Sequence, residues 1–145
     1  MTETTPDFDD VEVRAAIPAS HRDLLEAKAL AHVATIGPNG EPQNNPVWFG
    51  WDGQHLLFSQ TTDRQKYKNL QREDRIAVSI VDPTNDFRYL EIRGSVVRVD
   101  PDPDLAFINS MAKKYIGQDT YPNHQPGDER VVMVVAPRHT TEMGS

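Results

Sequence analysis

Short apolar runs separated by turn-forming residues dominate the chain and predict a β-rich fold. The runs AHVATI (31–36), HLLFSQ (55–60), IAVSIVD (76–82) and RVVMVVAP (130–137) all have strand length. GPNGEP follows the first run, Asp52-Gly53 precedes the second, and both are typical of hairpin turns. We therefore expect an antiparallel meander of three strands, whose middle strand covers residues 43–51.

The apolar residues change phase within the run 88–100. Leu90 and Ile92 occupy even positions before Gly94, whereas Val97 and Val99 occupy odd positions after it. Because side chains alternate along a strand with a period of two, such a change requires an inserted residue or a sharp bend. We predict a bulge or a barrel corner at Gly94.

Three segments carry helical signals. Ser20, followed by Asp23 and several apolar residues, is typical of a capped helix. Residues 61–73 show a helical spacing of apolar positions, and residues 105–116 follow the acidic run DPDPD (100–104), which the positive end of a helix dipole favours. Six strands and two or three helices indicate an α+β protein around a small, mainly antiparallel barrel.

Length and composition limit the classes of protein. The 145 residues correspond to one domain, and we expect a flexible acidic arm over residues 1–16 and a single domain over 17–145. The chain has no cysteine, which excludes disulfide scaffolds and thiolate metal sites. Its formal charge of −7 argues against a nucleic-acid partner. With no secretory leader and no apolar membrane span, we expect a cytoplasmic protein.

Common catalytic and metal-binding signatures are missing from the sequence. It contains no G-x-G-x-x-G, Walker A, G-x-S-x-G or H-E-x-x-H pattern. The five histidines show no i, i+3 or i+4 pairing, so we expect no metal site. No pair of carboxylates stands out as a general acid and base, and neither Tyr115 nor Tyr121 has local support as a proton donor. The catalytic residues therefore stay unassigned.

The positive signal is the basic segment SQTTDRQKYKNLQRE (59–73). Five of the 15 basic residues lie within residues 64–75. Hydroxyl side chains, Arg64 and Lys66 precede or open a helix, and helix N-termini with arginine are typical phosphate sites. The alternative is a basic amphipathic helix that only solvates one face of the domain. The sequence by itself leaves both interpretations open.

The large aromatic residues also allow two interpretations. Trp48, Phe49 and Trp51 are most simply core or interface residues, the usual fate of aromatics in a small β domain. Phe87 and Tyr89 follow a loop, and they are the better candidates to line a flat pocket for a conjugated ring.

The order of elements and several motifs resemble the flavin and deazaflavin-dependent split β-barrel oxidoreductases. This group is often labelled pyridoxamine 5′-phosphate oxidase-like, and the closest resemblance is to family B, which uses coenzyme F420. The matching segments are ALAHVATIGPNGEPQNNPVWF (29–49), FSQTTDRQKYKNLQREDRIAVSIVD (58–82), the strand with Gly94, and RVVMVVAPRH (130–139). The most specific piece is R-x-K-x-x-N-L, formed by Arg64, Lys66, Asn69 and Leu70.

The resemblance implies an FMN-binding type of split barrel that forms a homodimer, with a cofactor in each groove of the interface. Arg64 and Lys66 would hold the cofactor's phosphate, and Ser59 and Gln60 would line its ribityl chain. Thr35, and Phe87, Arg88 and Tyr89 of the neighbouring subunit, would lie near the ring system. The predicted cofactor-binding residues are Thr35, Ser59, Gln60, Arg64, Gln65, Lys66, Asn69, Phe87, Arg88 and Tyr89.

For function, the resemblance implies hydride transfer from reduced F420 to a small conjugated electrophile such as an enone, a quinone or a tetrapyrrole. FMN and F420 share a phosphate and a ribityl portion, so FMN stays an alternative cofactor. The oligoglutamate tail of F420 would favour further cations, for which Lys68, Arg72 and Arg88 are candidates. The alternative functions are an FMN-binding reductase or oxidase of the same fold, and a non-catalytic cofactor- or heme-binding module.

Overall fold

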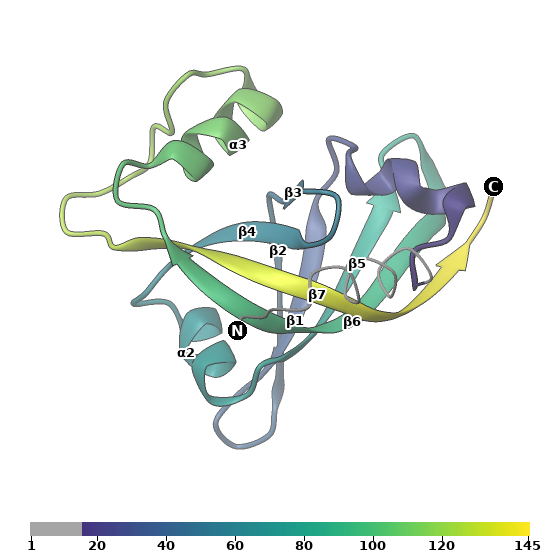
Figure 1. Cartoon of the computed structure of the whole chain (residues 1–145), viewed down its shortest axis with the longest axis horizontal. Coiled ribbons are helices and arrows are strands. Elements are labelled where there is room, and N and C mark those ends of the chain that lie inside the picture. Colours follow the sequence, from purple (N-terminus) through teal and green to yellow (C-terminus); the bar gives the residue numbers. More distant parts are fainter. Residues whose placement is uncertain (1–15) are drawn as a thin grey trace, which may run out of the picture.

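The apolar runs of the sequence form the strands of one curled antiparallel sheet (Figure 1). The computed structural model describes residues 16–145. Its strands are β1 (Ala31–Ile36), β2 (Pro42–Val47), β3 (Gly50–Trp51), β4 (Leu56–Thr61), β5 (Arg75–Asp82), β6 (Asn85–Pro101) and β7 (Arg130–Met143). Their spatial order is β2-β1-β5-β6-β7-β4-β3. The three helices are the 3-10 helix η1 (Ala19–Leu25), α2 (Gln65–Arg72) and α3 (Ala106–Ile116).

The sheet has seven strands, so the prediction of six was wrong. The difference lies in residues 43–51, which we expected to form one strand. Pairing with β1 ends at Val47, and pairing with β4 begins at Gly50. Between them the side chain of Phe49 is fully buried in the core. Burial of this ring takes the chain away from β1 and toward β4, which divides the segment into β2 and β3.

Two irregularities bend the pairing of β6 with β7. Arg93 pairs with His139 and Gly94 with Pro137, so the extra residue at the first irregularity belongs to β7. The second lies between Val96 and Arg98. It makes Val97, which is 45% exposed, the extra residue of β6. The change of apolar phase therefore occurs at Val97 and not at Gly94.

Gly94 nevertheless lies at the bend that we predicted. A Cβ atom at this position would be 2.1 Å from the carbonyl oxygen of Ala136, closer than real Cβ atoms approach backbone. The two strands can cross here only because residue 94 has no side chain.

The helices begin close to the predicted positions but differ in their caps. Ser20 does not cap η1, whose N-terminal end has no side-chain cap. The hydroxyl of Ser20 lies 2.7 Å from Nδ1 of the buried His21 instead. The acidic run expected before α3 contributes Asp102, whose carboxylate accepts the backbone N–H groups of Phe107 (3.1 Å) and Ile108 (3.2 Å), although the N-cap position itself is Leu105. Helix α2 begins four residues later than predicted because β4 extends through Thr61.

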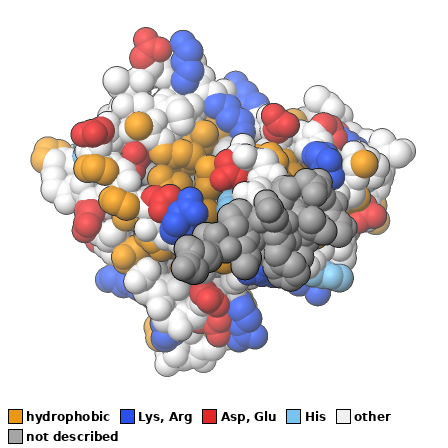
Figure 2. Space-filling view, in the orientation of Figure 1, with side chains coloured by type: hydrophobic (Ala, Val, Ile, Leu, Met, Phe, Trp, Pro, Cys, Tyr) orange, Lys and Arg blue, Asp and Glu red, His pale blue; other side chains and the backbone are white. Residues whose placement is uncertain are grey.

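The apolar residues form two clusters. The larger one fills the interior of the curled sheet and includes Phe49, Phe58 and Leu24. The smaller one lies under α3, where Ile108, Met111 and Tyr115 pack with Trp48. Figure 2 shows apolar side chains gathered near the centre of one face, with Lys, Arg, Asp and Glu side chains around them.

Three remaining expectations concern the acidic arm, membrane-spanning segments and metal sites. Apart from Ala16, the predicted acidic arm lies outside the described residues. Within residues 16–145, none of the helices is long and apolar enough to cross a membrane. In the same residues, no three His, Asp or Glu side chains are grouped to hold a metal ion.

Candidate functional site

A cavity of about 340 Å³ lies where the two ends of the curled sheet approach each other. Its lining combines residues of β2 with residues of β4, α2, α3 and the start of β7. The volume falls within the range of small-molecule sites. Four predicted site residues contribute to this lining, namely Ser59, Gln60, Arg64 and Lys66.

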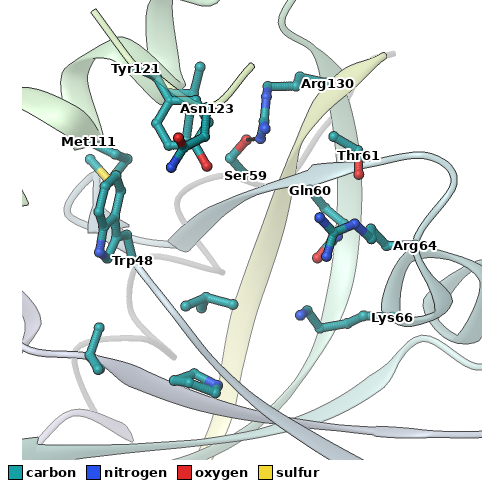
Figure 3. A pocket seen from close by; sticks show the side chains of 14 residues that line it. Trp48, Ser59, Gln60, Thr61, Arg64, Lys66, Met111, Tyr121, Asn123 and Arg130 are labelled. Carbon is teal, nitrogen blue, oxygen red and sulfur yellow. Dashed lines mark hydrogen bonds between the residues drawn. The ribbon is translucent and has the colours of Figure 1, made fainter. Parts of the chain in front are cut away.

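Lys66 is the most deeply buried charged residue of the cavity lining. The residue is only 8% exposed, and its side chain points into the cavity (Figure 3). Within residues 16–145 it has no hydrogen-bond or ion-pair partner. Burial lowers the pKa of Lys66, and the neighbouring positive charge of Arg64 lowers it further. A buried cation without a counter-charge is unfavourable, so this position is suited to an anionic ligand.

Gln60 provides a second buried polar group of the cavity lining. It is 7% exposed, and its backbone pairs with Val131 in the sheet. In the described part of the chain its amide side chain makes no hydrogen bond. A buried amide left unpaired costs about 1–3 kcal/mol. Together with the hydroxyl of Ser59, this amide is suited to a ligand that carries several hydroxyl groups.

Three predicted residues form a network behind the cavity and do not line it. The fully buried amide of Asn69 donates to Oγ1 of Thr35 (3.0 Å) and to Oε1 of Gln43 (3.1 Å). Its oxygen accepts from Nε2 of Gln65 (2.8 Å). These bonds attach α2 to β1 and β2. Thr35 and Asn69 therefore position the helix that carries Lys66, and their polar side-chain groups already have partners within the chain.

Phe87, Arg88 and Tyr89 lie far from this cavity within one chain. Tyr89 pairs with Met143 at one end of β7, whereas Arg130 lies at the other end. Phe87 is 80% exposed. We expected these residues to come from a neighbouring subunit, a prediction that a single chain does not test.

Two of the cations suggested for an oligoglutamate tail have structural partners instead. Arg88 forms ion pairs with Asp23 (2.5 Å) and Asp82 (2.8 Å), and these carboxylates raise the pKa of its guanidinium. Arg72 donates a hydrogen bond to the carbonyl oxygen of Ile36. Lys68 is exposed on α2.

The sequence analysis missed the aromatic wall and the third cation of the cavity. Trp48 lies parallel to Tyr115, with ring centroids 5.1 Å apart, and meets the edge of Tyr121 at 5.9 Å. Trp48, Met111 and Tyr121 lie across the cavity from Arg64 and Lys66 (Figure 3). A core role for Trp48 was therefore only partly right.

Arg130 also lines the cavity, where it lies beside Ser59 (Figure 3). One feature of the sequence could have indicated Arg130, since it is the first residue of the strongest apolar strand.

Of the two tyrosines considered as proton donors, Tyr115 already donates its hydroxyl hydrogen to the backbone. Its hydroxyl donates to the carbonyl of Ala29 (2.6 Å), and burial raises the pKa of this phenol, partly offset by the N–H of Phe49.

Residues 17–144 match the family model described as pyridoxamine 5′-phosphate oxidase. The chain belongs to this family. The assignment confirms the resemblance seen in the sequence, and it makes the protein a member of a flavin-type oxidoreductase family with the split-barrel fold. No protein with a curated description matches the chain.

Solved structures of the pyridoxamine 5′-phosphate oxidase fold resemble the chain over most of its length. An F420 reductase is 42% identical, with a TM-score of 0.79 and coverage of 86% of this chain and 98% of its own. A conserved hypothetical protein from Mycobacterium tuberculosis is 20% identical, with a TM-score of 0.68 and coverage of 98% and 89%. HupZ of Group A Streptococcus is also 20% identical, with a TM-score of 0.58 and coverage of 89% and 95%. The last two similarities concern the fold alone.

Proposed function

We propose that the protein is a coenzyme F420-dependent reductase that acts on a small conjugated electrophile such as an enone, a quinone or a tetrapyrrole. The observation that carries the proposal is the buried ammonium of Lys66, which has no partner within residues 16–145 and opens on a cavity of about 340 Å³. The choice of F420 is supported by the 42% identity to an F420 reductase.

The polar groups of the cavity fit the polar half of such a cofactor. Lys66 and Arg64 would bind its phosphate, because an ammonium and a guanidinium both donate charge-assisted hydrogen bonds to phosphate oxygens. The amide of Gln60 and the hydroxyl of Ser59 would bind the hydroxyls of its ribityl chain. The bound cofactor would supply the hydride.

The remaining work of the chain is binding and positioning. Trp48 and Met111 offer an apolar wall that excludes water from one side of the cavity. The network around Asn69 holds α2 against β1, which keeps Lys66 at a constant position relative to Gln60. We further propose a homodimer in which Phe87, Arg88 and Tyr89 complete the cavity of the neighbouring chain, because Phe87 is 80% exposed in one chain.

A flavin reductase or oxidase that uses FMN is the second candidate. It is favoured by the family assignment, and the phosphate and ribityl groups that Lys66 and Gln60 would bind are common to both cofactors. The two candidates differ in the cofactor that binds more tightly and not in the anion site.

A parallel titration separates these candidates. Cofactor-stripped protein is titrated with oxidised F420 and with FMN while tryptophan fluorescence is recorded. The chain has two tryptophans, so a Trp51→Phe variant leaves Trp48, which lines the cavity, as the only reporter. We expect both cofactors to quench Trp48 and F420 to bind at least tenfold more tightly.

Tighter binding of FMN would replace the F420 proposal with the flavin alternative, and binding of neither would contradict both. Reduced F420 is then mixed with a panel of enones, quinones and tetrapyrroles, and its reoxidation is followed by absorbance. Tight F420 binding without reoxidation by any acceptor would favour a non-catalytic module.

A further inference from the structure

Arg130 is a cation of the cavity that the proposed phosphate site does not use. Its Nη1 lies 3.2 Å from Oγ of Ser59, and its Nε lies 3.3 Å from Nδ1 of His124. Its guanidinium carbon lies 4.7 Å from the centre of the Tyr121 ring. The serine oxygen and the aromatic ring are neutral, and Nδ1 of His124 also lies 4.0 Å from Oδ2 of Asp128. These contacts fix the orientation of Arg130, and none of them is a direct contact with a carboxylate.

The acidic residues near Arg130 in the sequence have other partners. Oε1 of Glu129 accepts from the hydroxyl of Thr62 (3.1 Å), and Oδ2 of Asp128 accepts from the backbone of Gln125 (3.0 Å). Among residues 16–145, no carboxylate oxygen lies within 4.0 Å of the Arg130 guanidinium. The cavity lining likewise contains no aspartate or glutamate. Its potential is therefore set by three positive groups, Arg64, Lys66 and Arg130.

The free donors of Arg130 suit a carboxylate. A guanidinium has five N–H groups. His124 and Ser59 occupy two of them, which leaves three on the terminal nitrogens. Two N–H groups of this planar fork bind a carboxylate through both of its oxygens. Arg130 also lies on the same side of the cavity as Tyr121, and Arg64 and Lys66 lie on the other side (Figure 3).

We infer that Arg130 forms a second anion site, which binds the carboxylate of a ligand whose conjugated part lies against Trp48 and Tyr121. The inference rests on the proposed function, because it assumes that the phosphate of the cofactor occupies Lys66. It extends that function by giving the ligand a charge. The carboxylate can belong to the acceptor or to the glutamate tail of the cofactor, and the test has one arm for each source.

The first arm compares a conjugated acid with its neutral ester. Cinnamate and methyl cinnamate are titrated into F420-loaded protein, and binding is measured by calorimetry. For the wild type we expect the acid to bind about tenfold more tightly than the ester, as for a charge-assisted bidentate pair. In Arg130→Gln we expect nearly equal affinities, with the affinity for the ester unchanged. Arg130→Lys, which retains the charge without the fork, should give an intermediate preference.

The second arm compares F420 with the deazaflavin that lacks the phosphate and the glutamate tail. A tenfold loss of F420 affinity in Arg130→Gln, without loss for the truncated compound, would assign the carboxylate to the cofactor. Lys66 would bind the phosphate, which the truncated compound also lacks. The same comparison is therefore made in Lys66→Met, where Arg130 is intact, so that the loss of the phosphate contact is measured separately from the loss of the carboxylate contact. If Arg130→Gln changes neither the preference for the acid nor the affinity for F420, the second anion site is refuted.

The design also separates failure of the inference from failure of the proposed function. If F420 and FMN do not bind, the acid and the ester are compared in the stripped protein with Lys66→Met, where Arg130 and Arg64 are the remaining cations. An equal affinity for acid and ester there would refute the site. A melting temperature of Arg130→Gln close to that of the wild type, together with an unchanged affinity for the ester, would show that the variant is folded.

Discussion

Replacing Lys66 by methionine should weaken cofactor binding and stabilise the empty protein. Methionine has a similar length and can fill the same space without a charge. In the empty wild type, Lys66 is 8% exposed as a whole residue, and its ammonium has no partner within residues 16–145. The substitution removes this unfavourable burial, so we expect a melting temperature equal to or above that of the wild type.

The loss of affinity follows from the same burial. A hydrogen bond to a charged group contributes about 1.5–3 kcal/mol, which corresponds to an increase in Kd of about 10- to 150-fold. The buried position of Lys66 favours the upper part of this range, because water screens a buried charge poorly. Lys68→Met, two positions later on the exposed face of α2, should leave the Kd within about twofold. Fluorescence titration and thermal unfolding measure the two effects separately.

The difference in stability between Lys66→Met and the wild type should decrease as the pH rises. Burial lowers the pKa of Lys66 below its ordinary value of 10.5. Between the lowered pKa and 10.5, the unfolded chain binds more protons than the folded one, so the stability of the wild type rises with pH in that interval. The advantage of Lys66→Met should therefore shrink as the pH approaches 10.5. A variant that is less stable than the wild type, yet binds cofactor equally well, would refute the assignment of Lys66 to an anion site.

Three further predictions concern the framework of the site. Asn69→Leu should destabilise the protein by about 1–3 kcal/mol, measured by urea unfolding, because it removes the partner of several buried polar groups. Gly94→Ala should lower the free energy of unfolding by about 3 kcal/mol or more, or prevent folding, because the added Cβ would lie 2.1 Å from a backbone oxygen. A variant as stable as the wild type would contradict the close approach of β6 and β7 at this position. The hydrogen bond from Arg88 lowers the pKa of Asp23, and hydrogen bonds from Thr84 and Arg88 lower that of Asp82. The contribution of these bonds should be present above the ordinary carboxyl value of 3.8 and be lost as the pH falls through the lowered pKa values, and Arg88→Met should flatten this acid limb in thermal unfolding.

The parts of the fold predicted from sequence are those encoded by local pattern. The strand β1 matches its apolar run at both ends, and Asp102 of the acidic run accepts backbone N–H groups from the first turn of α3. The division of residues 43–51 could not be read locally, because it depends on the burial of Phe49 against distant strands. The irregularity predicted at Gly94 is present between Arg93 and Gly94, with its extra residue in β7. The second irregularity, where Val97 is the extra residue of β6, was not predicted.

For the site as well, the sequence predicted only the residues that lie close together along the chain. Arg64 and Lys66 share one segment with Ser59 and Gln60, so the sequence could group them around the start of a helix. Arg130 and Tyr121 reach the cavity through a loop of irregular sequence, and Trp48 reaches it through the break between two strands. These residues lie close together because β4 is next to β7 in the sheet. The order of strands in the sheet cannot be derived from the spacing of residues in the sequence.

The position of β4 in the sheet has a consequence for folding kinetics. In the part of the chain that the structure describes, the hairpin of β3 and β4 joins the rest of the sheet through β7 alone, where Leu56 pairs with Val135 and Thr61 with Arg130. On the ribosome this hairpin must wait until β7 has been synthesised, although β1 can already pair with β2 and β5. Contacts of such long sequence separation slow folding. The wall that carries Ser59 and Gln60 should therefore be among the last parts of the molecule to form, and cofactor should bind only after that step.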